Sequence, residues 1–572
     1  MNSLKLNAPN QPGLHPELYL MGCAGPTGAR EPSPQRLGFK AFNLLRMAQM
    51  GLPVPPAFVL GTHFCANSAT QAEATQASLW APALQALESA SAGLRFGCAA
   101  RPLLLSVRSG APVSMPGMME TLLNIGLNDE TVQGLIRQTG NPRLAWDAYR
   151  RLVASFGEVV AGLPAALFED ELKLLCAGRD ERQLDFAELR GLSQRYLQLY
   201  LQATGEAFPQ SAQLQLQQAI AAVFASWQSD KACSYRAAHG IAAAIGTAVT
   251  VQAMVFGNAG ARSGAGVGFT RDPRSGAAGL WVDFLFNAQG EDVVSGRRSA
   301  QGHEQLQQVL PQLWDELQQA CARLERQMGD MQDFEFTVQD GRLFMLQTRD
   351  GKRTPQAQAR IALDLLREGV IDLPTAQLRC RGLDAERLRV SRVVALDGQA
   401  MAPIARAQAA SSGVAMGQIV LDEAGALAAQ AAGTPAILLR RDAETGDSAA
   451  LALTLGLLTQ NGARTSHAAV VARQMGKVCL VACEGLRIDE ARREIRIGEL
   501  CLSEGDWISL DGNEACVYPG QVQTDWWCPP GLLDELAQLQ QSATQANAQG
   551  TAPPAAKVDP DRDAQTPQLQ PV

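Results

Sequence analysis

One histidine lies where the sequence predicts that a helix begins. Thr465-Ser466 supply a helix N-cap before His467, and the run Ala468-Ala-Val-Val-Ala-Arg-Gln-Met reads as helix until Gly476 ends it. At a helix start the dipole keeps an imidazole neutral, and free backbone N–H groups favour an anion beside it. Both effects suit a histidine that carries a phosphoryl group. The position alone favours a histidine that only caps or packs there.

Two carboxylates share one face of a predicted strand. Asp333-Phe-Glu-Phe-Thr-Val alternates with period two, so Asp333 and Glu335 point one way while Phe334 and Phe336 point the other. Neighbouring carboxylates bind a hard divalent cation, and Mg²⁺ at nucleotide sites is held by one or two carboxylates plus phosphates. An ordinary solvated strand face is the alternative.

The turn after this strand decides which side chains join the pair. A two-residue turn at Asp340-Gly341 would set Gln347 across from Phe334, whereas a three-residue loop at 339–341 with a bulge would set it across from Asp333. The three-residue loop separates polar from apolar side chains more cleanly. We therefore expect that loop, with Gln347 on the carboxylate face.

Cations and a glycine-containing loop in the first part of the chain could bind phosphates. The segment Ser106-Val-Arg-Ser-Gly-Ala-Pro-Val-Ser-Met-Pro-Gly-Met-Met-Glu-Thr joins a strand end to a loop whose backbone N–H groups can face a phosphate chain. Arg108 could clamp a phosphate with two parallel hydrogen bonds. Lys40 is a single cation in an apolar stretch, which fits either a phosphate contact or a side chain reaching out to solvent.

Length and charge narrow the classes of protein that could position these residues. The chain has 572 residues, 46% hydrophobic and 19% charged, which predicts three or four domains. Its net charge of -8 gives no positive field for nucleic acid. Twelve scattered cysteines lack zinc spacing and suggest a reducing compartment. Since no run of about 18 apolar residues occurs, we expect a cytoplasmic protein without a membrane partner.

Composition and periodicity divide the chain into five segments. Residues 130–240 are rich in Leu, Ala, Gln and Arg and predict helices, whereas strand patterns return after them. After Trp527 large apolar residues become scarce, which predicts disorder. The expected α+β multidomain organisation is an N-terminal extension at 1–36, an α+β domain at 37–353 with a helical subdomain at about 130–240, a helical linker at 354–401, a compact domain at 402–522 and a disordered tail at 523–572.

Several long blocks together resemble the pyruvate, phosphate dikinase family, in that family's order. The resemblance runs from about Leu37 to Val522. Its blocks are Ser106 to Asp129, Gln252-Ala-Met-Val-Phe-Gly-Asn, Phe269-Thr-Arg-Asp-Pro, Asn287-Ala-Gln-Gly-Glu-Asp-Val-Val, Met331-Gln-Asp-Phe-Glu-Phe-Thr, Leu346-Gln-Thr-Arg-Asp-Gly-Lys-Arg-Thr and Thr465-Ser-His-Ala-Ala-Val-Val-Ala-Arg.

The resemblance implies an ATP-grasp domain with a helical insert, followed by a swivelling β/β/α phosphohistidine domain. In that family the histidine is phosphorylated at the Mg-ATP site and then moves to a barrel that holds pyruvate or phosphoenolpyruvate. By resemblance, His467 is the phosphocarrier and Thr465 a regulatory site. The implied ATP-binding set is Lys40, Arg108, Ser114, Met115, Gly117, Met118, Asp333, Glu335, Gln347 and Arg349, of which Asp333, Glu335 and Gln347 would hold Mg²⁺.

The chain also departs from the family pattern. It reads Gly38-Phe-Lys-Ala-Phe-Asn-Leu where Gly-Gly-Lys-Gly-Ala-Asn-Leu is usual, which adds bulk to a loop that approaches the nucleotide. Asp283 replaces a usual Glu, and Gly462-Ala-Arg replaces Gly-Gly-Met before Thr465. Nothing after Val522 resembles the barrel, so we expect the acceptor on a separate barrel-domain protein.

Three interpretations remain open from the sequence. The first is a phosphotransferase that phosphorylates His467 from Mg-ATP, with phosphate as a further substrate, and passes the group to an acceptor on a partner. The second is a phosphotransferase for another small molecule, such as an antibiotic or a phenol. The third is a nucleotide-binding regulatory protein with reduced catalysis, suggested by Phe39 and Phe42. Homo-oligomerisation is left open.

Overall fold

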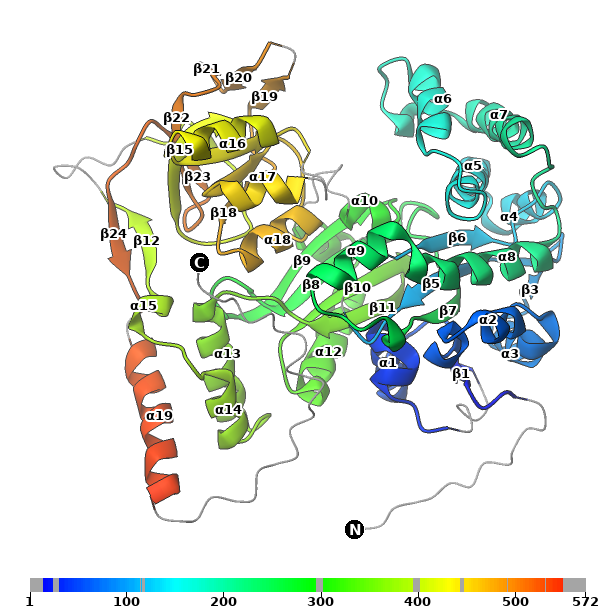
Figure 1. Cartoon of the computed structure of the whole chain (residues 1–572), viewed down its shortest axis with the longest axis horizontal. Helices are drawn as coiled ribbons and strands as arrows, with labels where there is room; N and C mark the ends of the chain where they lie inside the picture. The colour runs from blue at the N-terminus through cyan, green and yellow to red at the C-terminus, as the bar shows by residue number, and fades with distance from the viewer. Residues whose placement is uncertain are drawn as a thin grey trace. The chain divides into compact units, whose positions relative to one another are not determined.

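The computed structural model describes residues 14–23, 30–113, 115, 119–294, 302–394, 402–442, 447–490, 492–529 and 531–548. These residues form two compact units (Figure 1). The first contains the residues up to Gly260 together with Phe344–Gln347, and the second contains Ala261–Leu343 and the residues from Thr348 onward. The α+β class is confirmed. The nucleotide-binding domain expected at 37–353 is not one compact unit, because its two sheets have separate cores.

An antiparallel five-stranded sheet forms the first unit's base. Its order is β1 (Leu18–Met21), β2 (Ala57–Leu60), β7 (Ala248–Ala253), β5 (Leu105–Gly110) and β6 (Thr121–Ile125). All four residues of β1 are buried and pair with β2. The prediction of an extension over 1–36 is therefore wrong from residue 18, because a four-residue apolar run becomes a strand only when a sheet edge accepts it.

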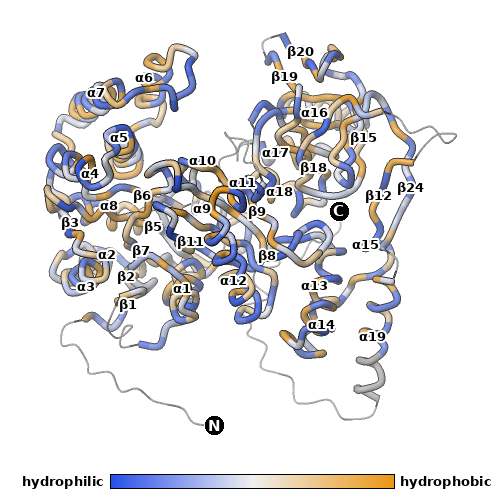
Figure 2. The backbone as a smooth tube through the Cα atoms, turned by 180° about the vertical axis from the view of Figure 1, so that it is seen from behind, coloured by the Kyte–Doolittle hydropathy of each residue, from blue (hydrophilic) through white to orange (hydrophobic). Residues whose placement is uncertain are grey.

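The predicted helical subdomain is confirmed. Its helices are α4 (Thr131–Thr139), α5 (Pro142–Val159), α6 (Ala166–Cys176), α7 (Phe186–Thr204), α8 (Ala212–Ala225) and α9 (Asp230–Ala238). Three helices precede the subdomain: α1 (Pro34–Gln49), α2 (Ser68–Ala74) and α3 (Ala77–Ala90). Between α3 and α4 a short strand β3 (Arg95–Phe96) pairs with β4 (Pro102–Leu103). Hydrophilic and hydrophobic segments alternate along α7 (Figure 2), and a capping box at Asp185 starts that helix.

The second unit begins with a four-stranded sheet that carries the predicted carboxylates. Its order is β11 (Arg342–Asp350), β10 (Gln332–Gln339), β8 (Gly264–Arg271) and β9 (Ala278–Phe286), accompanied by α10 (Gly290–Val294), α11 (Glu304–Val309) and α12 (Pro311–Met328). Phe334 and Phe336 are buried. A Cβ on Gly266 would lie 2.4 Å from the Phe336 ring, so glycine in β8 makes room for the aromatic face of β10.

A larger sheet forms the domain that contains His467. Its order is β13 (Ala405–Arg406), β23 (Cys516–Pro519), β22 (Trp507–Asp511), β15 (Val414–Val420), β16 (Ala436–Arg440), β17 (Gly456–Thr459), β18 (Val478–Val481) and β14 (Gln408–Ala409). Helices α16 (Glu423–Ala431), α17 (Ser448–Leu453) and α18 (His467–Gln474) and a second sheet, β19 (Leu486–Asp489), β20 (Glu494–Ile497) and β21 (Leu500–Ser503), complete it. We call residues 402–522 the carrier domain.

The segments on either side of the carrier domain come together in a helical base. The predicted linker forms α13 (Pro355–Arg367), α14 (Leu373–Arg379), α15 (Ala385–Leu388) and β12 (Val390–Val393), and β12 pairs with β24 (Thr524–Trp527) beyond the domain. Helix α19 (Leu532–Ala548) buries Leu532, Leu536 and Leu539 with α13 and α14 (Figure 1). The prediction of disorder from 523 is wrong up to residue 548, because α19 packs on apolar side chains of α13 and α14, more than 150 residues earlier in the chain.

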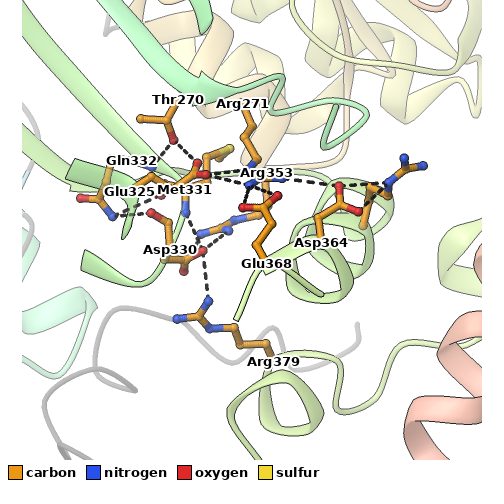
Figure 3. Close-up of polar contacts among 11 residues, drawn as sticks. Thr270, Arg271, Glu325, Asp330, Met331, Gln332, Arg353, Asp364, Glu368 and Arg379 are labelled. Atoms are coloured by element: carbon orange, nitrogen blue, oxygen red, sulfur yellow. Dashed lines mark hydrogen bonds and ion pairs between the residues drawn. The ribbon is translucent and has the colours of Figure 1, made fainter. Parts of the chain in front are cut away.

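Buried ion pairs fasten this helical base to the sheet of the second unit (Figure 3). Arg271 of β8 is 3% exposed and pairs with Glu325 of α12, with Asp364 of α13 and with Glu368, which follows α13. Asp330 pairs in the same way with Arg353 and Arg379 (2.6 and 3.4 Å). Arg271 and Asp330 therefore each have partners of opposite charge, and removing those partners would leave a buried charge uncompensated. Among all the helices described, none is both long and apolar enough to cross a membrane.

Helix α19 provides a direct test of this base. We expect Leu536→Ala to lower the free energy of unfolding by about 2–5 kcal/mol, because Leu536 is 3% exposed and its truncation leaves a cavity. Gln538→Ala, at an exposed position of the same helix, should change it by less than about 0.5 kcal/mol. Denaturant unfolding followed by circular dichroism measures both. Equal stability of the two variants would contradict the packed helix.

Candidate functional site

The turn between β10 and β11 differs from the expected one. Only Asp340 and Gly341 separate the two strands, and both have positive φ (52° and 75°), as a type I′ turn requires. The three-residue loop is therefore wrong. The Asp340 N–H donates to Ser263 Oγ and the Gly341 N–H to the Arg262 carbonyl, so contacts with the start of β8 stabilise the tighter turn.

Arg349 of β11 contacts the first of the two carboxylates across the hairpin. β11 has nine residues and β10 has eight. At the far end of the hairpin, the Gly351 N–H donates to the Met331 carbonyl and Arg349 Nε donates to Asp333 Oδ2 at 2.8 Å, which places Arg349 opposite Asp333. Gln347 and Thr348 are both buried, which interrupts the in-out alternation of β11 at this point. The grouping of Gln347 with the two carboxylates therefore stays a prediction.

Burial distinguishes the two carboxylates. Asp333 is 3% exposed, and burial raises the pKa of its carboxyl even though Arg349 acts in the opposite direction. Glu335 is half-buried. Within the described ranges no group of three or more His, Cys, Asp and Glu side chains gathers as a metal cluster. Two carboxylates on one strand face fit Mg²⁺ whose other ligands come from a phosphate chain and water.

The helix start predicted at His467 is confirmed. Ser466 is the N-cap, its Oγ accepts from the Ala469 N–H at 3.4 Å, and α18 begins with the backbone of His467. The helix ends at Gln474, and Gly476 follows with φ 66°. The side chain of His467 lies outside the described part of the structure, so its role as phosphocarrier stays a prediction.

Contacts that the sequence did not connect hold the loop before α18. Asp283 of β9 accepts hydrogen bonds from Arg464 and Thr465, 181 and 182 residues further along the chain. The sequence marked both Asp283 and Arg464 as departures from a family pattern but contained no signal that they meet. Arg473 of α18 was not singled out. It is 4% exposed, its Nη1 has no hydrogen-bond partner among the described residues, and burial lowers the pKa of its guanidinium to about 10.

The first unit brings the predicted phosphate-binding segments together. α1 is interrupted at Gly38 (φ 69°), and a Cβ there would lie 2.1 Å from the Gly110 carbonyl oxygen at the end of β5. The next residue, Phe39, donates its N–H to the Ala111 carbonyl at 3.1 Å. The segment that carries Lys40 therefore lies against the end of the strand that carries Arg108. Gly38 takes the position where a Cβ would meet the backbone, and Phe39 follows it.

The structure describes only some of the other residues predicted to bind ATP. Met115 is 8% exposed and belongs to the core of the first unit. Ser114, Gly117 and Met118 lie outside the described residues. Lys40 and Arg108 belong to the first unit and Asp333, Glu335 and Arg349 to the second. Whether both sets bind one nucleotide stays a prediction.

Two family descriptions match the chain. Residues 83–308 and 300–369 match "Pyruvate phosphate dikinase, AMP/ATP-binding domain". Residues 433–515 match "PEP-utilising enzyme, mobile domain". The first match includes the strands with Arg108, Asp333 and Glu335, and the second includes α18.

Curated relatives extend the similarity over most of the chain. Pyruvate, phosphate dikinase 1 (chloroplastic) of Zea mays is 41% identical over 517 residues, 90% of this chain and 54% of the relative. The corresponding protein of Oryza sativa is 42% identical over 505 residues, 87% and 53%. Pyruvate, phosphate dikinase 2 of Oryza sativa is 41% identical over 508 residues, 88% and 57%. The chain therefore spans about half the length of these relatives.

The close approach at Gly38 predicts that a side chain at this position weakens ATP binding. Gly38→Ala should lower the free energy of unfolding by about 2–5 kcal/mol, because the new Cβ meets backbone at a left-handed φ. It should also weaken ATP binding at least about 10-fold by displacing Lys40 from β5. Calorimetric titration with Mg-ATP and denaturant unfolding measure the two effects.

Gly140→Ala is the matched control for this variant. Gly140 has φ 64° in the same unit, but a Cβ added there would meet no non-neighbouring atom within 4 Å. Its substitution should cost only about 1–2 kcal/mol of backbone strain and leave ATP affinity unchanged. Equal ATP affinity of the Gly38 and Gly140 variants would contradict the assignment of this segment to the nucleotide site.

Proposed function

This chain belongs to the pyruvate, phosphate dikinase family, and from that premise we propose that it phosphorylates its own His467 from Mg-ATP. The phosphoryl group then goes to an acceptor outside the two matched domains. Phosphate takes the remaining phosphoryl group of ATP in this proposal, with water as the other acceptor to be tested.

The contact between Asp283 and the loop of Arg464 and Thr465 is the observation that supports the proposal most. β9, which carries Asp283, lies in the same sheet as β10, which carries Asp333 and Glu335. The loop that precedes His467 is therefore bonded to the sheet on which a magnesium nucleotide would bind. A phosphocarrier and its donor need this proximity, since phosphoryl transfer depends on in-line positioning.

The chain's own residues have distinct tasks in this transfer. Lys40 and Arg108 would bind ATP phosphates, and Arg349 orients Asp333 through the 2.8 Å hydrogen bond. Asp333 and Glu335, with Gln347 beside them, would hold Mg²⁺, which neutralises phosphate charge when bound. The N-terminus of α18 favours both a neutral imidazole and an incoming anion. The nitrogen of His467 then forms the N–P bond as a P–O bond of ATP breaks.

The same observations give less support to two other functions. A regulatory protein without turnover has no chemical need for the lysine, the arginines, the two carboxylates and the histidine together. A transferase for an unrelated small molecule would need an acceptor site that neither matched family description names.

Thr465 is proposed as a site of control. It is 5% exposed, and its hydroxyl donates to Asp283 Oδ2 at 3.0 Å. A phosphoryl group on Thr465 would bring about two negative charges against that carboxylate. The loop would then be repelled from β9, and the transfer to His467 should stop.

Labelling from ATP tests the proposal. We expect the wild-type protein to acquire an acid-labile, base-stable phosphoryl group with Mg-ATP, and His467→Asn to acquire none. Glu335→Gln should be slower by about 100-fold or more, because charge neutralisation is lost in the transition state. ATP labelled separately at the β and γ positions, with and without phosphate, identifies the group transferred.

His303→Asn is the control for this labelling. His303 stacks on Trp314 at 4.6 Å and belongs to neither proposed set, so its substitution should leave the label intact. Wild-type labelling of the His467→Asn variant, or a label that survives acid but not base, would refute the phosphohistidine.

The acceptor needs a separate test. We expect the chain by itself to form no phosphoenolpyruvate from pyruvate, ATP and phosphate, and to do so when the barrel domain of a dikinase is added. A coupled assay for phosphoenolpyruvate measures both. The relatives are single chains about twice as long as the matched region, which gives no independent support to a separate partner. Turnover by the chain alone at an ordinary enzyme rate would contradict the proposal.

A further inference from the structure

Asp283 receives hydrogen bonds from two consecutive residues of the carrier domain. Arg464 donates from Nη2 (2.8 Å) and Nε (3.1 Å) to Oδ1. Thr465 donates from its N–H (3.1 Å) and its Oγ1 (3.0 Å) to Oδ2. The Asp283 side chain is fully buried, so both of its oxygens are occupied by this loop. Such a geometry specifies one position of the loop on β9.

Trp281 adds an aromatic surface to the same contact. It lies two residues before Asp283 in β9 and therefore on the same face. The Arg464 guanidinium lies 4.4 Å from the centre of a Trp281 ring, and the Arg473 guanidinium lies 5.4 Å from it. Arg473 Nη2 also donates to the Arg464 carbonyl at 3.2 Å. The indole thus stacks against one arginine before α18 and one within α18.

The energetics favour a role in positioning over a role in overall stability. A buried ion pair loses in desolvation much of what it gains in attraction, so its net contribution to stability is small. The ion pair forms in only one position of the loop, because a displaced loop would leave the buried Asp283 carboxylate without the Arg464 guanidinium. The pair therefore discriminates between the correct position of the loop and nearby incorrect ones.

We propose that Arg464 is a positioning residue for phosphoryl transfer: by pairing with Asp283 and stacking on Trp281, it sets where the first residue of α18 lies on the nucleotide-binding sheet. This inference rests on the proposed function. Arg464 acts through the loop 462–466 and does not itself contact the phosphate. The substitution of Arg464 should therefore change the rate of transfer to His467 and leave the affinity for ATP unchanged.

Single-turnover labelling of His467 tests this prediction. We expect Arg464→Met to slow labelling at saturating Mg-ATP about 10- to 100-fold, with an unchanged ATP dissociation constant. Arg464→Lys should recover part of the rate, because it restores the charge without the two-nitrogen geometry. Arg441→Met removes an arginine from an exposed pair of the same domain (66% exposed) and should label at the wild-type rate.

A double-mutant cycle separates the pair from two independent effects. Asp283→Asn and Arg464→Met should each slow labelling, and the double variant should be no slower than the worse single variant. Fully multiplied effects, or wild-type labelling by Arg464→Met, would overturn the proposal. Thermal unfolding of each variant confirms that the folded protein is being compared.

Hydrogen exchange distinguishes a failure of this inference from a failure of the proposed function. The Thr465 N–H donates to Asp283, so Arg464→Met should speed exchange of a peptide covering residues 461–468 about 10-fold or more, with or without phosphorylation. If wild-type protein does not label, the proposed function fails, and faster exchange would still support the contact. Unchanged exchange in Arg464→Met would overturn the inference whatever the labelling shows.

Discussion

The buried carboxylate of Asp283 is the interaction on which the proposed chemistry depends. It connects a strand of the second unit's small sheet with the loop before α18, through donors on Arg464 and Thr465. Arg473 of α18 adds contacts with Phe269 and Trp281 of the same sheet, which also contains the strand that carries Asp333. The same carboxylate gives the proposed control at Thr465 an electrostatic basis, because added negative charge there opposes Asp283.

The sheet β11-β10-β8-β9 has an aromatic face, a polar face and ends that are held by helices. Its aromatic residues pack where β8 has glycines, its polar face carries Asp333 and Arg349, and its ends are fastened to α12, α13 and α14 by buried ion pairs (Figure 3). The carrier domain is attached to that helical base by the paired strands β12 and β24. The carrier domain is thus held at two places: by the helical base through β12 and β24, and by Asp283 through the loop before α18.

Local patterns were sufficient for many elements. The strands of the carboxylate hairpin, the helical subdomain and the start of α18 were predicted because period, caps and glycines act within a few residues. The two strands were predicted correctly, but the turn between them was not. Asp340 and Gly341 adopt the tighter turn because the start of β8 accepts their N–H donors, a contact more than 70 residues distant in the chain.

The sequence by itself determined the family and the order of the two matched domains and proposed candidate residues for phosphoryl transfer, since these depend on residue types and short spacings. Only the tertiary structure decided that residues 18–21 and 532–548 are ordered, because short or polar-rich segments fold when distant partners bury their apolar side chains. It also decided that Asp283 and Arg464 meet. A pair separated by 181 residues has no local signal, and its geometry exists only once two sheets have formed.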